Sequence, residues 1–182
     1  MVAVQDDELS TFRVPEHLVQ CESHPPDYLH DAKVGVIIFS SRKDHVLLLK
    51  TSETASHPNT WEYPGGSIEL DVEPEHIDES IIHAAVRECR EVTQLHISNF
   101  IDVVRDQWIK GNQEVRKFIF IVNVHDNQNP EPMWTKVGLN PAKHQAFLWA
   151  ERAMVEGMDE DMFFPKQKQT ILDSFEFVRN ML

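Results

Sequence analysis

The stretch HAAVRECREVTQL at residues 83–95 decides the fold, because it belongs to a helix with separate apolar and charged faces. Apolar side chains recur there at spacings of three and four, the period of an amphipathic helix, at Ile77, Ile81, Ala84, Ala85, Cys89 and Val92. Charged side chains follow another face at intervals of four, at Glu79, His83, Arg87 and Glu91, with Glu88 on an adjacent line. We predict a helix over residues 73–92, with Pro74 in its first turn and Asp78 or Ser80 as its cap. By periodicity alone, the charged face also fits an ordinary solvated surface with i,i+4 ion pairs.

Short apolar segments on both sides of this helix predict strands. Residues 33–40 and 45–51 are expected to form a hairpin of two buried strands, and residues 96–104, 116–124 and 144–150 three further strands. The sequence Pro-Gly-Gly at residues 64–66 predicts a tight bend, with positive φ as the reason for glycine. Residues 167–182 predict an amphipathic helix that packs on the sheet. The predicted fold is an α/β/α sandwich in which helices flank a mixed sheet.

Composition limits the classes of function. The chain has 182 residues, 41% of them hydrophobic, and a formal net charge of −13. Such a charge argues against binding a nucleic-acid polymer or an anionic membrane. Two distant cysteines, no signal-peptide pattern and no apolar run of membrane-spanning length predict a cytoplasmic protein without a disulfide framework. We divide the chain into an N-terminal extension at residues 1–30 and one domain at residues 31–182.

The motif around the central helix resembles that of the Nudix hydrolases. Residues 61–66, WEYPGG, match the segment that leads into the family motif. Glu79 stands at the family's first Glu, and Arg87 and Glu88 match its Arg-Glu pair. Cys89 fills the aliphatic position, and Glu91 is the first of the paired acids. The resemblance covers roughly residues 30–182. This part of the sequence is similar to small fungal-type Nudix domains.

The resemblance implies hydrolysis of a nucleoside diphosphate linked to another moiety, or of a related organic diphosphate. It implies Mg²⁺ or Mn²⁺ bound by the Gly65 carbonyl, Glu88 and Glu91, with Arg87 orienting Glu88. The chemistry agrees, because divalent cations neutralise diphosphate oxygens and activate the attacking water, and because they favour carboxylate ligands on rigid backbone.

The sequence also departs from the family pattern. Val92 occupies the second paired-acid position, Gln94 replaces a Gly, and the loop between Gly66 and Glu79 is longer by seven residues. Lys143 stands where related domains carry a further acid. These changes remove negative charge from the implied metal site, so we expect weakened metal binding. Loop acids are candidate replacement ligands, namely Glu69, Asp71 and Glu73.

Three functions follow from this pattern and stay open at the level of sequence. The first is the metal-dependent hydrolase. The second is metal-independent acid/base chemistry on a small organic or natural-product substrate, with His83 or His144 beside Glu88 or Glu91. The third is a ligand-binding module without catalysis. Candidate substrate contacts are Trp108, Trp134 and Lys143, the expected partner is a small molecule, and a homodimer is left open.

Overall fold

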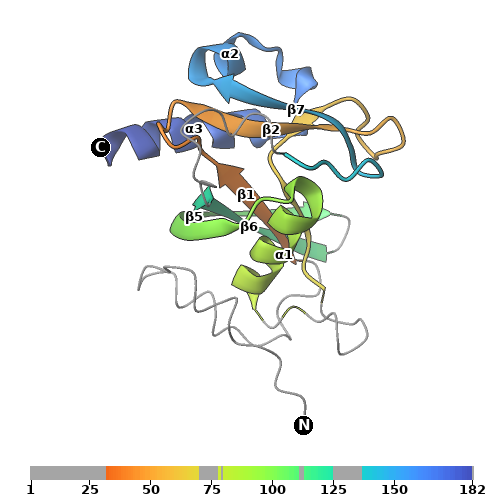
Figure 1. The fold of residues 1–182 in the computed structure, drawn as a ribbon. Coiled ribbons are helices and arrows are strands. Elements are labelled where there is room, and N and C mark those ends of the chain that lie inside the picture. Colours follow the sequence, from red (N-terminus) through yellow and green to blue (C-terminus); the bar gives the residue numbers. More distant parts are fainter. Residues whose placement is uncertain (1–31, 70–77, 79, 111–112, 125–136, 182) are drawn as a thin grey trace.

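The computed structural model describes residues 32–69, 78, 80–110, 113–124 and 137–181, in which the strands form two sheets (Figure 1). The first sheet has the order β4-β1-β6-β5, and the second has the order β3-β2-β7. Strands β1 and β6 are parallel and the other pairs are antiparallel, so the first sheet is mixed. The bounds are β1 Ala32–Ile38, β2 His45–Thr51, β3 Trp61–Glu62, β4 Gly65–Ser67, β5 Ile97–Lys110, β6 Gln113–Val124 and β7 His144–Glu151.

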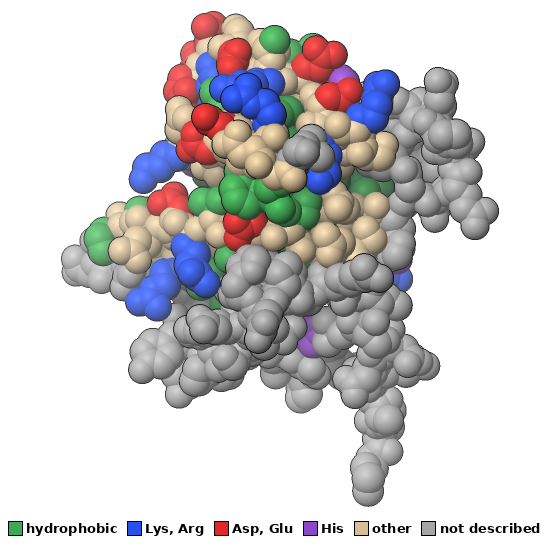
Figure 2. All heavy atoms as spheres, turned by 90° about the vertical axis from the view of Figure 1, so that its left-hand side faces the viewer, with side chains coloured by type: hydrophobic (Ala, Val, Ile, Leu, Met, Phe, Trp, Pro, Cys, Tyr) green, Lys and Arg blue, Asp and Glu red, His purple; other side chains and the backbone are tan. Residues whose placement is uncertain are grey.

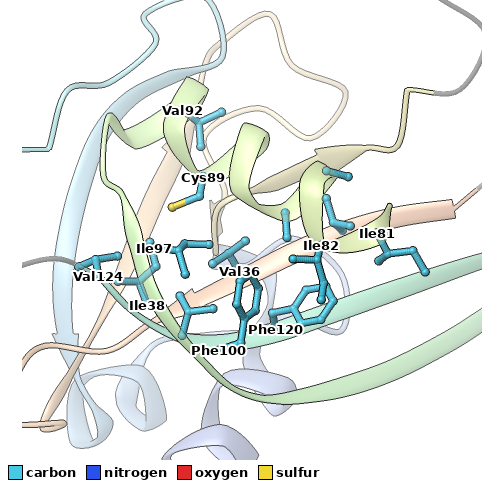
Figure 3. Close-up of a cluster of buried hydrophobic side chains, with 14 of the residues drawn as sticks. Val36, Ile38, Ile81, Ile82, Cys89, Val92, Ile97, Phe100, Phe120 and Val124 are labelled. Carbon is cyan, nitrogen blue, oxygen red and sulfur yellow. The ribbon is translucent and has the colours of Figure 1, made fainter. Parts of the chain in front are cut away.

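Helices cover both sides of this arrangement. Their bounds are α1 Ile81–Thr93, α2 Arg152–Gly157, the 3-10 helix η5 Glu160–Met162 and α3 Gln167–Asn180. Strand β1 alternates between two hydrophobic clusters, because successive side chains of a strand point to opposite faces. Val36 packs with α1 (Figure 3), as does Val34, while Ile37 packs with α3. The predicted fold, a mixed sheet flanked by helices, is therefore confirmed.

The central helix starts later than the sequence pattern predicts. Ser80 is its cap, with an extended backbone and a side-chain oxygen that accepts a hydrogen bond from the N–H of His83 at 3.1 Å. The helix therefore begins at Ile81, whereas we predicted a start at residue 73; Pro74, Ile77 and Glu79 lie outside the described residues. Asp78 is not the cap because its carboxylate binds Arg87.

The expected hairpin of β1 and β2 is wrong. These strands share only a bridge between Phe39 and Val46 and the adjoining hydrogen bond from Ser40 N to His45 O, and they then enter different sheets. Both strands are buried along most of their length, so each has neighbours on both faces. Apolar runs of this kind predict burial but do not specify the partner strand.

The glycines of the Pro-Gly-Gly segment are required for a different reason from the predicted one. Gly65 and Gly66 belong to β4, and neither has a positive φ. Close approach explains both glycines. A Cβ on Gly65 would lie 2.4 Å from the backbone oxygen of Val34, and one on Gly66 would lie 2.0 Å from a carboxylate oxygen of Glu88.

Charged groups of both signs are interspersed around hydrophobic side chains on the face shown in Figure 2, rather than forming one patch of a single sign. None of the helices in the described part of the chain is long and apolar enough to cross a membrane.

Candidate active site

Arg87 lies at the centre of a cluster of four acidic side chains. Its guanidinium binds Asp78 in a bidentate manner, with Nε donating to Oδ1 at 2.9 Å and Nη2 to Oδ2 at 2.7 Å. Nη2 also donates to the Ser67 carbonyl at 3.0 Å, which ties α1 to β4. Burial alone would lower the pKa of Arg87, but the hydrogen bonds and charge of Asp78, together with Glu88 and Glu69, raise it above its ordinary value. Arg87 is therefore a fixed cation.

The other guanidinium nitrogen, Nη1, faces three carboxylates. It donates to Glu88 Oε1 at 3.2 Å and Glu91 Oε1 at 3.3 Å, and Glu69 Oε1 lies 3.7 Å away. Asp78 holds Glu69 in place, because the backbone N–H of Glu69 donates to Asp78 Oδ2 and the N–H of Asp78 donates to the Glu69 carbonyl, both at 2.8 Å. The structure therefore places the loop acid Glu69 beside the two helix acids.

Glu88 and Glu91 have different environments although both belong to α1. The Glu88 side chain is 4% exposed and lies against Gly66, in space that a side chain on that glycine would occupy. Glu91, one turn closer to the helix end, is 45% exposed. The site thus combines one buried carboxylate in a fixed position with one that solvent reaches.

Lys143 closes the cluster from the opposite side. Its Nζ lies 3.4 Å from Glu88 Oε2 and 3.5 Å from Glu91 Oε2, so one ammonium is shared by both predicted metal ligands. Lys143 immediately precedes β7 of the second sheet, whereas α1 packs on β1 and β4 of the first sheet. The site is therefore assembled across the seam between the two sheets.

The cluster carries more acids than cations, but in the described residues its carboxylates are not arranged as a ready metal site. The acids Glu69, Asp78, Glu88 and Glu91 face the cations Arg87 and Lys143, which leaves a net charge of −2 in this cluster. Within the described ranges, no three His, Cys, Asp or Glu side chains form a ready metal-binding group. Lys143 lies between the two carboxylates instead, and it is 44% exposed and so free to withdraw into solvent. One cation held by Glu88, Glu91 and Glu69 would balance the excess charge.

His144, the next residue, makes a separate buried pair. Its Nε2 lies 3.0 Å from Glu62 Oε1, and the His144 side chain is 3% exposed. Its Nδ1 is buried and has no hydrogen-bond partner in the part of the chain that the structure describes. The contact with Glu62 fixes the orientation of the imidazole, and the burial of Nδ1 closes that nitrogen to solvent.

The remaining predicted residues lie in several places. His83 is half-buried on α1, one turn before Arg87. Trp108 is half-buried on β5, and Gly65 is the first residue of β4. Val92 is fully buried in the hydrophobic cluster under α1, so the paired-acid position that it occupies belongs to the core here (Figure 3). Trp134, Asp71 and Glu73 lie outside the described residues.

Sequence reasoning missed the roles of Asp78 and Glu62. The sequence suggested Asp78 only as a candidate cap. In the structure its carboxylate binds Arg87 instead. Glu62 belongs to the segment WEYPGG at residues 61–66. It pairs with His144, 82 positions later, and such a distant contact leaves no local pattern in the sequence.

Comparisons with known proteins identify the family and the fold of the chain. Residues 29–170 match the family model of the NUDIX domain. A crystal structure of a MutT protein from Methanosarcina mazei Go1 aligns with a TM-score of 0.57 and 18% identity, covering 81% of this chain and 94% of that one. A C. elegans Ap4A hydrolase aligns with a TM-score of 0.56 and 16% identity, covering 83% and 98%. A Nudix hydrolase from M. smegmatis, RenU, has a TM-score of 0.59 and 17% identity, covering 83% and 86%.

These structures are too distant in sequence to transfer a substrate, and they show the fold alone. No curated protein matches the chain in sequence. The family model, in contrast, spans most of the chain and includes α1, β4 and the Lys143 segment. The chain belongs to the NUDIX-domain family.

Proposed function

We propose that the chain hydrolyses a nucleoside diphosphate linked to another moiety, or a related organic diphosphate, with weakened binding of Mg²⁺ or Mn²⁺. Nudix hydrolases act on small molecules and generally use divalent metals. The observation that carries the proposal is the position of Lys143 Nζ, 3.4 Å from Glu88 and 3.5 Å from Glu91. The contact supports a cation site, because Glu88 and Glu91 already bind one positive group. It also supports weakened metal binding, because Lys143 competes with a metal ion for the same carboxylates.

Glu88, Glu91 and Glu69, with the Gly65 carbonyl, are the groups that would hold a divalent ion. When bound, such an ion neutralises diphosphate oxygens and lowers the pKa of the attacking water. Arg87 keeps the three carboxylates together through Nη1. Its bidentate contact with Asp78 prevents it from leaving, so Arg87 positions Glu88 for catalysis. Lys143 supplies positive charge to the same carboxylates while no ion is bound.

The test is a calorimetric titration of Mn²⁺ into chelator-treated protein. Wild type should bind weakly, Lys143→Met should bind about tenfold more tightly because the competing ammonium is gone, and Glu88→Gln/Glu91→Gln should not bind. Hydrolysis of a panel of nucleoside diphosphates linked to sugars or to second nucleosides should require Mn²⁺ or Mg²⁺. Equal Mn²⁺ affinity in wild type and Lys143→Met would contradict the competition, and activity retained by the double Gln variant would contradict the site.

The buried His144–Glu62 pair favours a second candidate, metal-independent acid/base chemistry on a small organic substrate. Activity of this kind would survive a chelator and be lost in His144→Asn and Glu62→Gln, while Glu88→Gln/Glu91→Gln would retain it. Chelator-sensitive activity would argue against it. Saturable binding of a small molecule without turnover in either condition would favour the ligand-binding module instead.

Three broader expectations remain proposals alongside the site: the division at residues 30 and 31, a cytoplasmic location, and a homodimer as an open alternative to a monomer.

A further inference from the structure

Strand β7 contains a β-bulge next to the charged cluster around Arg87. Through most of their length β2 and β7 pair one residue to one, up to Lys50 with Ala146. Thr51 then pairs with His144 rather than with Gln145, so Gln145 is an extra residue in β7. A bulge of this kind changes the direction in which the neighbouring side chains of its strand point.

The bulge places His144 on the face of the second sheet that meets α1. Leu49 belongs to the hydrophobic cluster under α1, and Thr51, two positions later on β2, shares its face. Residues directly opposite each other on paired strands lie on one face, so His144 shares the face of Thr51. Glu62 pairs with Leu49 and lies there too, with Oε1 3.0 Å from His144 Nε2. A regular strand, one residue out of this register, would turn His144 to the other face.

The side chain of Gln145 holds the bulge. Its Nε2 donates to the Thr51 carbonyl at 2.7 Å and to Asn59 Oδ1 at 2.8 Å, which joins the extra residue to the end of β2 and to the loop that follows. That loop is itself fixed, because Thr51 Oγ1 donates to the His57 carbonyl at 2.7 Å and accepts from the N–H of Thr60 at 3.0 Å. One amide group therefore connects the bulge to both the strand and the loop.

Lys143 is anchored by its backbone just before the bulge. Its carbonyl accepts from the N–H of Ser52 at 3.0 Å, and its N–H donates to the Asn140 carbonyl at 3.0 Å. Ser52 directly follows Thr51, so the register that pairs Thr51 with His144 also aligns Ser52 with Lys143. The position from which the ammonium reaches the two carboxylates of α1 is thus set by the same register.

We propose that Gln145 is a positioning residue for the candidate site and acts through His144 and Lys143. It keeps the bulge at its place in β7, and the bulge directs His144 to Glu62 and Lys143 to the carboxylates of α1. The effect on metal binding rests on the proposed function, in which Lys143 competes with the ion. The contact of His144 with Glu62 involves no metal, so it reports the bulge independently.

The test compares Gln145→Ala with wild type in a nitrogen–proton correlation spectrum of the histidine side chains, recorded on the metal-free full chain. The Glu62 carboxylate accepts only from a protonated Nε2, so it selects this tautomer of neutral His144. The His144 signal is identified by its loss in His144→Asn. In Gln145→Ala it should move from the Nε2–H tautomer to the mixture of tautomers that a solvated imidazole shows.

Calorimetry supplies the second measurement. Gln145→Ala should bind Mn²⁺ about tenfold more tightly than wild type, like Lys143→Met, because the ammonium is no longer held over the carboxylates. Simple loss of stability would not produce tighter binding. Gln145→Glu, which keeps the side-chain length but has no N–H donor when ionised, should repeat both results.

Gln169→Ala is the matched control, because Gln169 also donates from Nε2, at 2.7 Å to Asp173 Oδ1, but on α3. Asn59→Asp keeps the acceptor for Gln145 and tolerates the positive φ of 62° at that position. Both variants should retain the wild-type tautomer and Mn²⁺ affinity. An unchanged His144 tautomer in Gln145→Ala and Gln145→Glu would overturn the proposal. A changed tautomer in a chain that binds no Mn²⁺ would support it and contradict the proposed function.

Discussion

Two groups of charged side chains, one around Arg87 and Lys143 and the other around Lys117, differ in the contacts that stabilise their cations. Around Arg87 and Lys143, every cation has carboxylate partners, and acids are in excess. Lys117 is instead half-buried, and its Nζ lies 4.5 Å from the centre of the Tyr63 ring. A cluster with surplus acids favours binding of a cation, whereas an ammonium over an aromatic ring is stabilised by the ring itself.

The largest expected effect comes from adding an acid to the first cluster at its family position. Val92→Glu would place a carboxylate in a fully buried apolar position, and we expect it to lower the free energy of unfolding by about 4 kcal/mol. Urea denaturation would measure it, with Val92→Ala as a control that loses about 1 to 2 kcal/mol by cavity formation alone. A Val92→Glu protein as stable as wild type, with tighter Mn²⁺ binding, would show that position 92 faces the site instead.

The next largest effect on stability is expected from removing Asp78, the principal partner of Arg87. Asp78→Ala leaves a guanidinium that is 21% exposed without its bidentate acid, and we expect a loss of about 3 kcal/mol in unfolding free energy. The control is Glu156→Ala, which removes an i,i+4 partner from the exposed Arg152 and should change stability far less. Equal losses in the two variants would mean that burial does not distinguish these pairs.

A third change removes the ammonium of Lys117, which lies over the Tyr63 ring. Because the folded pKa of Lys117 is about 8, below the ordinary value of 10.5, the unfolded chain holds more protons between these values, so wild-type stability should rise with pH from 8 to 10.5. The groups that act on Lys117 are Glu62, Lys33 and Asp106. Lys117→Met should raise the unfolding free energy at pH 7 by on the order of 2 kcal/mol.

Thermal unfolding followed by circular dichroism across this pH range would check both statements about Lys117. The control is Lys33→Met, which removes an exposed amine and should leave most of the pH-dependent rise in place. A Lys117→Met protein that keeps the full rise would disprove the assignment to Lys117.

The smallest stability effect is expected from Lys143→Met. Lys143 is nearly half exposed, and its buried partner Glu88 keeps its contact with Arg87, so loss of Lys143 should cost less than about 1 kcal/mol in denaturation experiments. The same variant is expected to bind Mn²⁺ about tenfold more tightly, so its effects on stability and on metal affinity separate. A large loss of stability would show instead that Lys143 is a structural cation.

Local patterns predicted the parts of this molecule that depend on neighbours in sequence. The period of α1, the Ser80 cap and the strands at β2, β6 and β7 follow from residues within a few positions of each other. Pairing across the fold left no such signal, so the separation of β1 and β2 into different sheets was not predicted.

The candidate site divides in the same way. Arg87, Glu88 and Glu91 were singled out because they match the family motif on α1, and Lys143 because of its position relative to the family pattern. Asp78 and Glu62 were missed because their partners lie 9 and 82 positions away. The two glycines of β4 were found for the wrong reason, because close packing against Val34 and Glu88 cannot be distinguished in sequence from a positive φ.

The seam between the sheets has a consequence for how the protein loses function on heating. Lys143 and His144 belong to the second sheet, while Glu88 and Glu91 stand on a helix that packs on the first. A small slip between the sheets would change all of these distances at once while both sheets kept their own hydrogen bonds. The contacts of Lys143 with Glu88 and Glu91 should therefore be lost before secondary structure, so the proposed hydrolysis would report the docking of the two sheets.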